Sequence, residues 1–157
     1  DISFQVHAIN PNSEFIAAAA IDVNRDGKLD VVCGSHWYEA PTWKQHFLRQ
    51  VEVIGNRLDG YAHLPIDLNS DERLDLLLVN WRSKSLQWVE QPSTATTPWP
   101  LHVIDMPGNM ETGRLFDVDR DGQLDLLPNG SKFAAWWAID TSEQNSAPKF
   151  TRCDLPA

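Results

Sequence analysis

Three short acidic segments of this sequence have the residue types and spacing of calcium-binding loops. Each is nine residues long, they begin 45 and then 50 residues apart, and they share the pattern D-x-[DN]-x-D-x-x-x-D at 22–30, 67–75 and 117–125. A cation of calcium's size takes six to eight oxygen ligands, and alternate residues of a tight loop point toward one centre. Side chains at positions 1, 3 and 5 therefore supply oxygens, the backbone carbonyl of position 7 adds another, and the aspartate at position 9 takes the place of the last glutamate of an EF-hand.

We refer to these segments as loops one, two and three. The predicted ligands, in chain order, are Asp22, Asn24, Asp26, Lys28, Asp30, Asp67, Asn69, Asp71, Arg73, Asp75, Asp117, Asp119, Asp121, Gln123 and Asp125. Glycine at position 6 permits a sharp turn in loops one and three, whereas loop two has Glu72, for which a positive φ is strained. Calcium is expected in loops one and three, and a third site at 67–75 is left open: loop two either binds weakly or uses Ser70 and water as ligands. The alternative is a set of Asx-rich turns without metal.

The loops also explain where the charge of the protein lies. The 157 residues have a formal net charge of −9, and the three loops carry −1, −3 and −3 of it. No cluster of lysine and arginine offers a phosphate-binding surface, so a nucleic-acid partner is not expected. The longest apolar runs, 15–21 and 133–139, are far shorter than the ~20 residues that span a bilayer, so no membrane span is expected either.

The segments around each loop repeat as well. A short, mostly apolar stretch precedes each loop, and a β-type run, a turn, a tryptophan segment and a final strand-like segment follow it. Four short strands per 45–50 residues predict an all-β protein made of β-propeller blades. The alanine run at 17–20 is read as an inner strand for the same reason. The chain then forms one propeller region over 1–157, with blades at about 14–50, 60–105 and 113–155, and 1–10 supplies the outer strand of a preceding blade, centred on 4–9.

The three loops and their flanks resemble the FG-GAP and VCBS-type repeats of secreted bacterial proteins and of the integrin α-subunit propeller. The resemblance covers about 14–155, although the Phe-Gly and Gly-Ala-Pro hallmarks of that family are absent. The segments 37–41 (WYEAP) and 88–92 (WVEQP) are closer to the bacterial branch. The resemblance implies that the calcium is mainly structural and that the protein is secreted, extracellular or periplasmic.

Three blades are too few to close a ring, because propellers typically have four to eight. Exposed blade edges need a partner, since unpaired strand edges aggregate. The partner is expected to be the rest of a larger propeller or, alternatively, another copy of the chain that pairs through its blade edges. Cys33 and Cys153 match no metal or redox spacing and are predicted to be free thiols.

Two functions remain open from the sequence. The first is a non-enzymatic binding or assembly module with a protein or glycan partner, which would meet the face opposite the loops; the candidate ligand-binding residues are Trp81, Arg82, His63 and Asn109. The alternative is the propeller part of a carbohydrate-active enzyme, similar to polysaccharide lyases or aldos-2-ulose dehydratases. No catalytic residue is predicted beyond His63, which is the best placed acid or base if it faces a central channel.

Overall fold

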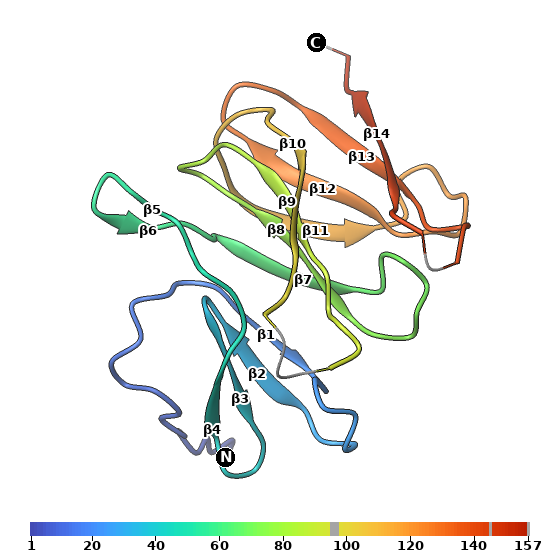
Figure 1. The fold of residues 1–157 in the computed structure, drawn as a ribbon. Coiled ribbons are helices and arrows are strands. Elements are labelled where there is room, and N and C mark those ends of the chain that lie inside the picture. The colour runs from blue at the N-terminus through green and yellow to red at the C-terminus, as the bar shows by residue number, and fades with distance from the viewer. Residues whose placement is uncertain (95–97, 145, 157) are drawn as a thin grey trace.

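The computed structural model describes residues 1–94, 98–144 and 146–156, and within these residues the chain forms strands, turns and loops but no helix. Three sheets of four antiparallel strands, blades one to three, follow one another along the chain (Figure 1). Blade one contains β1 (Ala18–Ile21), β2 (Asp30–Cys33), β3 (His36–Glu39) and β4 (Lys44–Phe47). Blade two contains β7 (Ala62–Ile66), β8 (Asp75–Val79), β9 (Leu86–Val89) and β10 (Leu101–Asp105). Blade three contains β11 (Met110–Phe116), β12 (Asp125–Gly130), β13 (Ala135–Asp140) and β14 (Lys149–Asp154).

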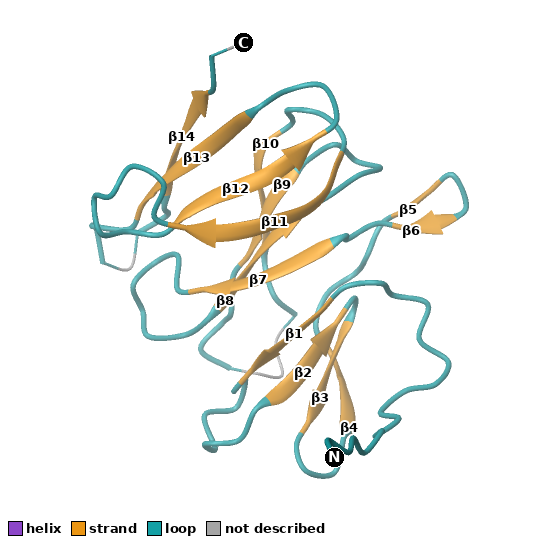
Figure 2. Cartoon of the chain, turned by 180° about the vertical axis from the view of Figure 1, so that it is seen from behind, coloured by secondary structure: helices purple, strands orange, loops and turns teal. Residues whose placement is uncertain are grey.

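The innermost strands of the three blades lie side by side. β7 contacts β1 on one side and β11 on the other, and both views of the chain show the blades stacked in chain order (Figures 1 and 2). The blades do not close into a ring. The sequence prediction of an all-β chain built from four-stranded antiparallel blades is therefore confirmed, in the form of a partial β-propeller.

Blade two forms the centre of the core because its second strand is buried on both faces. Successive side chains of a strand point to opposite faces. Leu76 and Leu78 of β8 pack in an apolar cluster with Ile21, Val32 and Trp37 of blade one. Leu77 and Val79 point the other way, into a second cluster whose members from blade three include Leu126 and Trp137. The continuous apolar run of β8 thus joins the two neighbouring blades.

The N-terminal segment differs from the prediction. No strand forms at residues 1–17, and Phe4 and Val6 are exposed. The reason is that the blade predicted to pair with 4–9 is not part of these 157 residues, so the backbone of this segment has no sheet to join. A small hairpin of β5 (Val53–Ile54) and β6 (Arg57–Leu58) lies between blades one and two and was not predicted.

Cys33 and Cys153 are free, and both are half-buried. Among the residues that the structure describes, none belongs to a helix of the length and apolarity needed to cross a bilayer.

Gly113 of β11 lets blades two and three approach closely. A Cβ at this position would lie 2.9 Å from Val79 Cγ2, 3.2 Å from Leu126 Cδ1 and 3.3 Å from Leu64 Cδ1. We therefore expect Gly113→Ala to lower the free energy of unfolding by about 1–3 kcal/mol through overpacking, measured by urea denaturation. Val79→Ala removes the closest methyl group, so the double variant should be less destabilised than the sum of the two single variants. Additive effects would contradict this packing.

Candidate metal-binding loops

The three acidic loops occupy equivalent places in the three blades. Each connects the innermost strand to the second strand: β1 to β2, β7 to β8 and β11 to β12. Because the inner strands run in the same direction, the loops gather on one side of the molecule, at the right in Figure 1 and at the left in the reversed view of Figure 2. The fold thus presents three copies of one acidic turn on one face.

Two residues of each loop have a left-handed backbone. At position 4 the φ angles are +61°, +56° and +67° for Arg25, Ser70 and Arg120. At position 6 they are +84°, +66° and +92° for Gly27, Glu72 and Gly122. These two turns fold the loop back on itself, so that its amides face the carboxylates. Glu72 has a positive φ, as its position in the loop predicts, and residues with a Cβ are strained in this conformation.

The aspartate at position 9 is buried and connects its loop to the rest of the blade. Asp30 is 0% exposed. One of its oxygens accepts the backbone N–H of Val23 at 2.9 Å, and the other accepts the backbone N–H of Ala40 at 2.8 Å. The carboxylate therefore joins the start of loop one, the beginning of β2 and the end of β3.

The same arrangement recurs in blade two, and its contact within the loop recurs in blade three. Asp75 is also 0% exposed and accepts the backbone N–H of Leu68 at 3.1 Å and that of Gln91 at 2.7 Å. Burial raises the pKa of Asp75 to about 7, against the effect of these two hydrogen bonds. Asp125 accepts the N–H of Val118 at 2.8 Å. The position-9 aspartates are thus part of the framework of each loop, in addition to their predicted role as ligands.

Most side chains at positions 1, 3 and 5 accept hydrogen bonds from backbone N–H groups of their own loop. In loop one, Asp22 accepts the backbone N–H groups of Asp26 and Gly27 at 3.0 and 2.8 Å, and Asn24 Oδ1 also accepts that of Asp26, at 3.1 Å. The position-5 carboxylates Asp26, Asp71 and Asp121 each accept the backbone N–H of position 7. Nearly all the acidic side chains are therefore held in place by the backbone of their own loop.

Two oxygens at predicted ligand positions are buried without a hydrogen-bond partner. They are Asp117 Oδ1, at position 1 of loop three, and Asn69 Oδ1, at position 3 of loop two. A buried oxygen without a partner is costly, and such groups call for a ligand or ordered water. Both atoms belong to the set that the spacing assigns to a cation.

The residue at position 7 makes the three loops differ. The ammonium group of Lys28 lies 2.7 Å from Asp26 Oδ2 in loop one. In loop two the Arg73 guanidinium binds Asp71 and also donates to the backbone carbonyl of Gln91 at 3.2 Å. Gln123 in loop three is neutral. A positive charge of the protein's own thus accompanies the acidic side chains of loops one and two, but position 7 supplies none in loop three.

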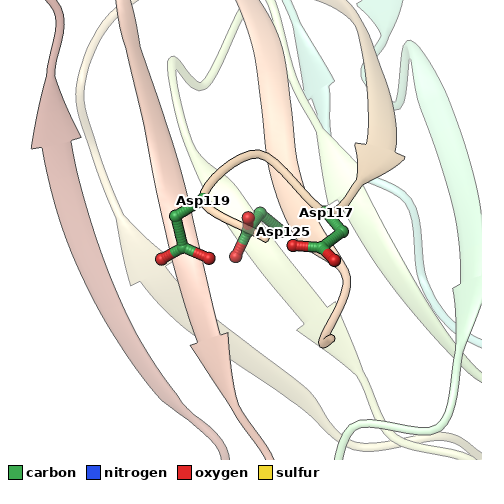
Figure 3. Close-up of side chains that lie close together, drawn as sticks. All are labelled: Asp117, Asp119 and Asp125. Carbon is green, nitrogen blue, oxygen red and sulfur yellow. The ribbon is translucent and has the colours of Figure 1, made fainter. Parts of the chain in front are cut away.

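Loop three consequently brings acidic groups together most closely. Ligand atoms of Asp117, Asp119 and Asp125 all lie within 4.8 Å of one another (Figure 3). Of the remaining residues predicted for this loop, Asp121 is not part of this group, and the contribution expected of Gln123 is its carbonyl oxygen. In the described residues, no other group of three acidic, histidine or cysteine side chains meets at this spacing.

The candidate ligand-binding residues do not form one open site. Asn109 donates to the carbonyl of Trp81 at 2.7 Å, and the backbone N–H of Arg82 donates to Asp59 at 3.2 Å, so these segments are linked. His63, however, is only 6% exposed. A Cβ on Gly60 would lie 3.6 Å from both His63 Nε2 and Arg49 Nη2, so the imidazole is packed beside a buried guanidinium. It does not face an open channel, as the catalytic alternative requires.

The sequence reading missed two glutamates that contact the loops. Glu39 and Glu90 follow Trp37 and Trp88 at the same spacing, and each lies 3.4 Å from the amide nitrogen of a position-3 asparagine. The repeated Trp-x-Glu pattern was a signal that could have identified them.

The comparisons with known proteins agree with the repeat architecture. The family model described as an FG-GAP-like repeat matches residues 67–127, which run from the start of loop two to the middle of β12. The predicted FG-GAP-type repeat is therefore confirmed. No curated protein and no solved structure shows a significant match to the chain.

The burial of His63 predicts a pH dependence of stability. Burial, reinforced by the nearby Arg49 charge, lowers the pKa of His63 to about 3. Below about pH 6.5 the unfolded chain binds a proton at this histidine, whereas the folded chain does not. The free energy of unfolding therefore decreases as the pH falls from 6.5 toward 3, by at most about 1.4 kcal/mol per pH unit. We expect His63→Leu to flatten the fall in free energy of unfolding between pH 6.5 and 4, measured by denaturant titration. An unchanged slope would show that His63 is accessible to protons in the folded state.

The positive φ of Glu72 predicts a stabilising substitution. Glycine occupies this position in loops one and three, and the ion pair of Glu72 with Arg25 is exposed at 3.6 Å, so its loss matters little. We expect Glu72→Gly to raise the free energy of unfolding by about 1 kcal/mol, and Gly27→Ala, where a Cβ meets nothing within 4 Å, to lower it by about as much. The two variants should move the thermal midpoint in opposite directions; a shift in the same direction would contradict the backbone argument.

Proposed function

We propose that this chain is a calcium-stabilised β-propeller module that serves binding or assembly rather than catalysis. The observation that carries the proposal is loop three, where three carboxylates converge within 4.8 Å and Asp117 Oδ1 is buried without a partner. Carboxylates held this close repel one another, and a bound cation converts the repulsion into attraction. The donors are oxygens alone, with no histidine or cysteine in the loops, which suits calcium better than zinc or copper.

The side chains at position 7 rank the three loops in affinity. Loop three has a neutral Gln123 and should bind most tightly. Loop one must displace the ammonium group of Lys28, which is half-exposed and makes a single ion pair. Loop two must displace Arg73, which is less exposed and is also held by the Gln91 carbonyl, so it should bind most weakly. Calcium in loops three and one, with a weaker site in loop two, is the arrangement that we propose.

The proposed role of the metal is structural. Each loop joins two strands at the inner side of a blade, and its position-9 aspartate also binds the backbone of the same blade further along the chain in blades one and two. Pulling the acidic side chains onto one cation would fix the relative positions of these segments. Metal that binds only the folded chain raises its stability by mass action.

An apolar groove along the inner strands supports assembly. The groove has a volume of about 580 Å³ and is lined by residues of β7, β11 and β12, among them Leu64, Leu115 and Leu127. Phe116, at its end, is 64% exposed. Large exposed apolar surfaces mark sites of association. We propose that further propeller blades cover this surface, and that a second copy of the chain is the alternative occupant.

A protein or glycan partner remains the proposed ligand of the whole propeller. Trp81, Arg82 and Asn109 lie at the linked segments after β8 and before β11, and offer an aromatic face, a cation and an amide. Calcium sites of extracellular modules have dissociation constants of about 10⁻⁴–10⁻³ M. We propose that this chain has sites of the same kind and is secreted, extracellular or periplasmic. The burial of His63 gives the alternative of a carbohydrate-active enzyme no support.

The calcium proposal is tested by thermal unfolding with excess calcium and with excess chelator. At a free calcium concentration ten times the dissociation constant, each calcium site adds about 1.4 kcal/mol to the free energy of unfolding. Each kcal/mol raises the thermal midpoint by about 2–4 °C in a chain of this size. Asp117→Asn should lose much of the calcium-dependent rise in the thermal midpoint. Glu72→Gln also removes one negative charge, but from a residue that is not a predicted ligand, so this variant should keep the calcium-dependent rise in the midpoint. Identical midpoints with calcium and with chelator would overturn the proposal.

A further inference from the structure

Blades one and two share a second repeated cluster, outside the acidic loops but in contact with them. In blade one, the His46 ring stacks on Trp37 with centroids 4.2 Å apart, and His46 Nε2 donates to Glu39 Oε2 at 2.8 Å. In blade two, His102 stacks on Trp88 at 4.4 Å and donates to Glu90 Oε2 at 3.1 Å. We call each set of tryptophan, histidine and glutamate a support cluster.

Each support cluster reaches an acidic loop through its glutamate. Glu39 Oε1 lies 3.4 Å from the amide nitrogen of Asn24, and Glu90 Oε1 lies 3.4 Å from that of Asn69. Both asparagines stand at position 3 of their loop. In loop one the other end of the amide points into the loop, where Asn24 Oδ1 accepts the N–H of Asp26. In loop two, Asn69 Nδ2 also donates to Asp71 Oδ2 at 3.0 Å, and Asn69 Oδ1 is buried without a partner. In loop one the glutamate therefore contacts the donor end of the amide and leaves the oxygen for the loop interior, whereas in loop two Glu90 shares the donor end with Asp71.

Blade three provides a comparison within the same chain. The strand register places Ala138 where the other blades have Glu39 and Glu90, and Cys153 where they have His46 and His102. Loop three has Asp119 at position 3 instead of asparagine. The support cluster is thus present in the two blades with an asparagine at this position, and absent from the blade with an aspartate.

We propose that Glu39 and Glu90 are positioning residues that orient the position-3 asparagines toward a bound calcium ion. An amide has one acceptor end and one donor end, and a donor end turned inward would offer a cation no ligand. A carboxylate on the outer side binds the NH₂ group and fixes the oxygen inward; the histidine holds the carboxylate, and the tryptophan holds the histidine. Asp119 needs no such support, since both ends of a carboxylate are oxygens. This inference rests on the proposed calcium binding and assigns residues to it that the loop pattern does not contain.

A glutamate near a cation also acts through its charge, and the two effects give different results in a variant of loop one. Removing Glu39 weakens binding in either case. If Glu39 acts by positioning, Asn24→Asp makes it unnecessary, because an aspartate presents an oxygen in both orientations. If Glu39 acts by charge alone, its removal weakens binding equally with asparagine or aspartate at position 24.

The test uses the glycines at position 6 as separate reporters of two loops. The backbone N–H resonances of Gly27 in loop one and Gly122 in loop three are followed by ¹⁵N-HSQC during a calcium titration of the complete chain. We expect Glu39→Ala to weaken the affinity read at Gly27 about tenfold, in the range of other residues that orient metal ligands, and to leave the affinity read at Gly122 unchanged. In the Asn24→Asp background, Glu39→Ala should cause no loss at Gly27. The unchanged Gly122 titration also shows that the variant is folded.

The possible failures are distinguishable. An unchanged affinity at Gly27 in Glu39→Ala, or an equal loss in the Asn24→Asp background, would overturn the positioning role while leaving calcium binding intact. Absence of a calcium response at both glycines in the unmodified chain would overturn the proposed function, and the positioning role with it. His46→Phe keeps the aromatic stack on Trp37 but removes the donor to Glu39, and should give a smaller loss at Gly27 than Glu39→Ala; no loss would contradict the supporting role of the histidine.

Discussion

The fold of each blade depends on a buried aspartate at the end of its acidic loop. Asp30 and Asp75 are fully buried, and each uses both oxygens to bind backbone N–H groups from two separate segments of its blade. Buried carboxylates are stable only when their oxygens are satisfied. The loop can therefore take this shape only when the neighbouring strands are in place, which couples the acidic turn to the sheet.

The same constraint supports the proposed binding of a cation by the rest of the loop. With the ends of the turn fixed by the position-9 aspartate and its interior lined by oxygens, the acidic side chains cannot move apart to relieve their repulsion. Loops one and two partly compensate with Lys28 and Arg73, whereas loop three, with Gln123, does not. The side chain at position 7, whose expected ligand is only its backbone carbonyl, thus changes the net charge within three otherwise similar loops.

Much of this arrangement could be predicted from the sequence because it repeats. Three copies of one loop at near-constant spacing fix the number of blades and the place of the loops between the first two strands. Contacts between distant segments were harder to predict. The Trp-x-Glu pattern marks Glu39 as a repeated residue, but its contact with Asn24 depends on the register of β3, and the burial of His63 depends on the segment that carries Arg49. The strand predicted at 4–9 did not form because local pattern alone cannot supply the sheet that a strand must join.

The most direct test of the account is the number of calcium ions that the folded chain retains. Equilibrium dialysis against radioactive calcium at about 1 mM, in the range where extracellular modules bind, measures it without a spectroscopic probe. We expect saturable uptake of at least two ions per chain, with one ion fewer when Asp117 and Asp119 are both replaced by asparagine. Uptake that does not saturate, or that is the same in this double variant, would contradict it.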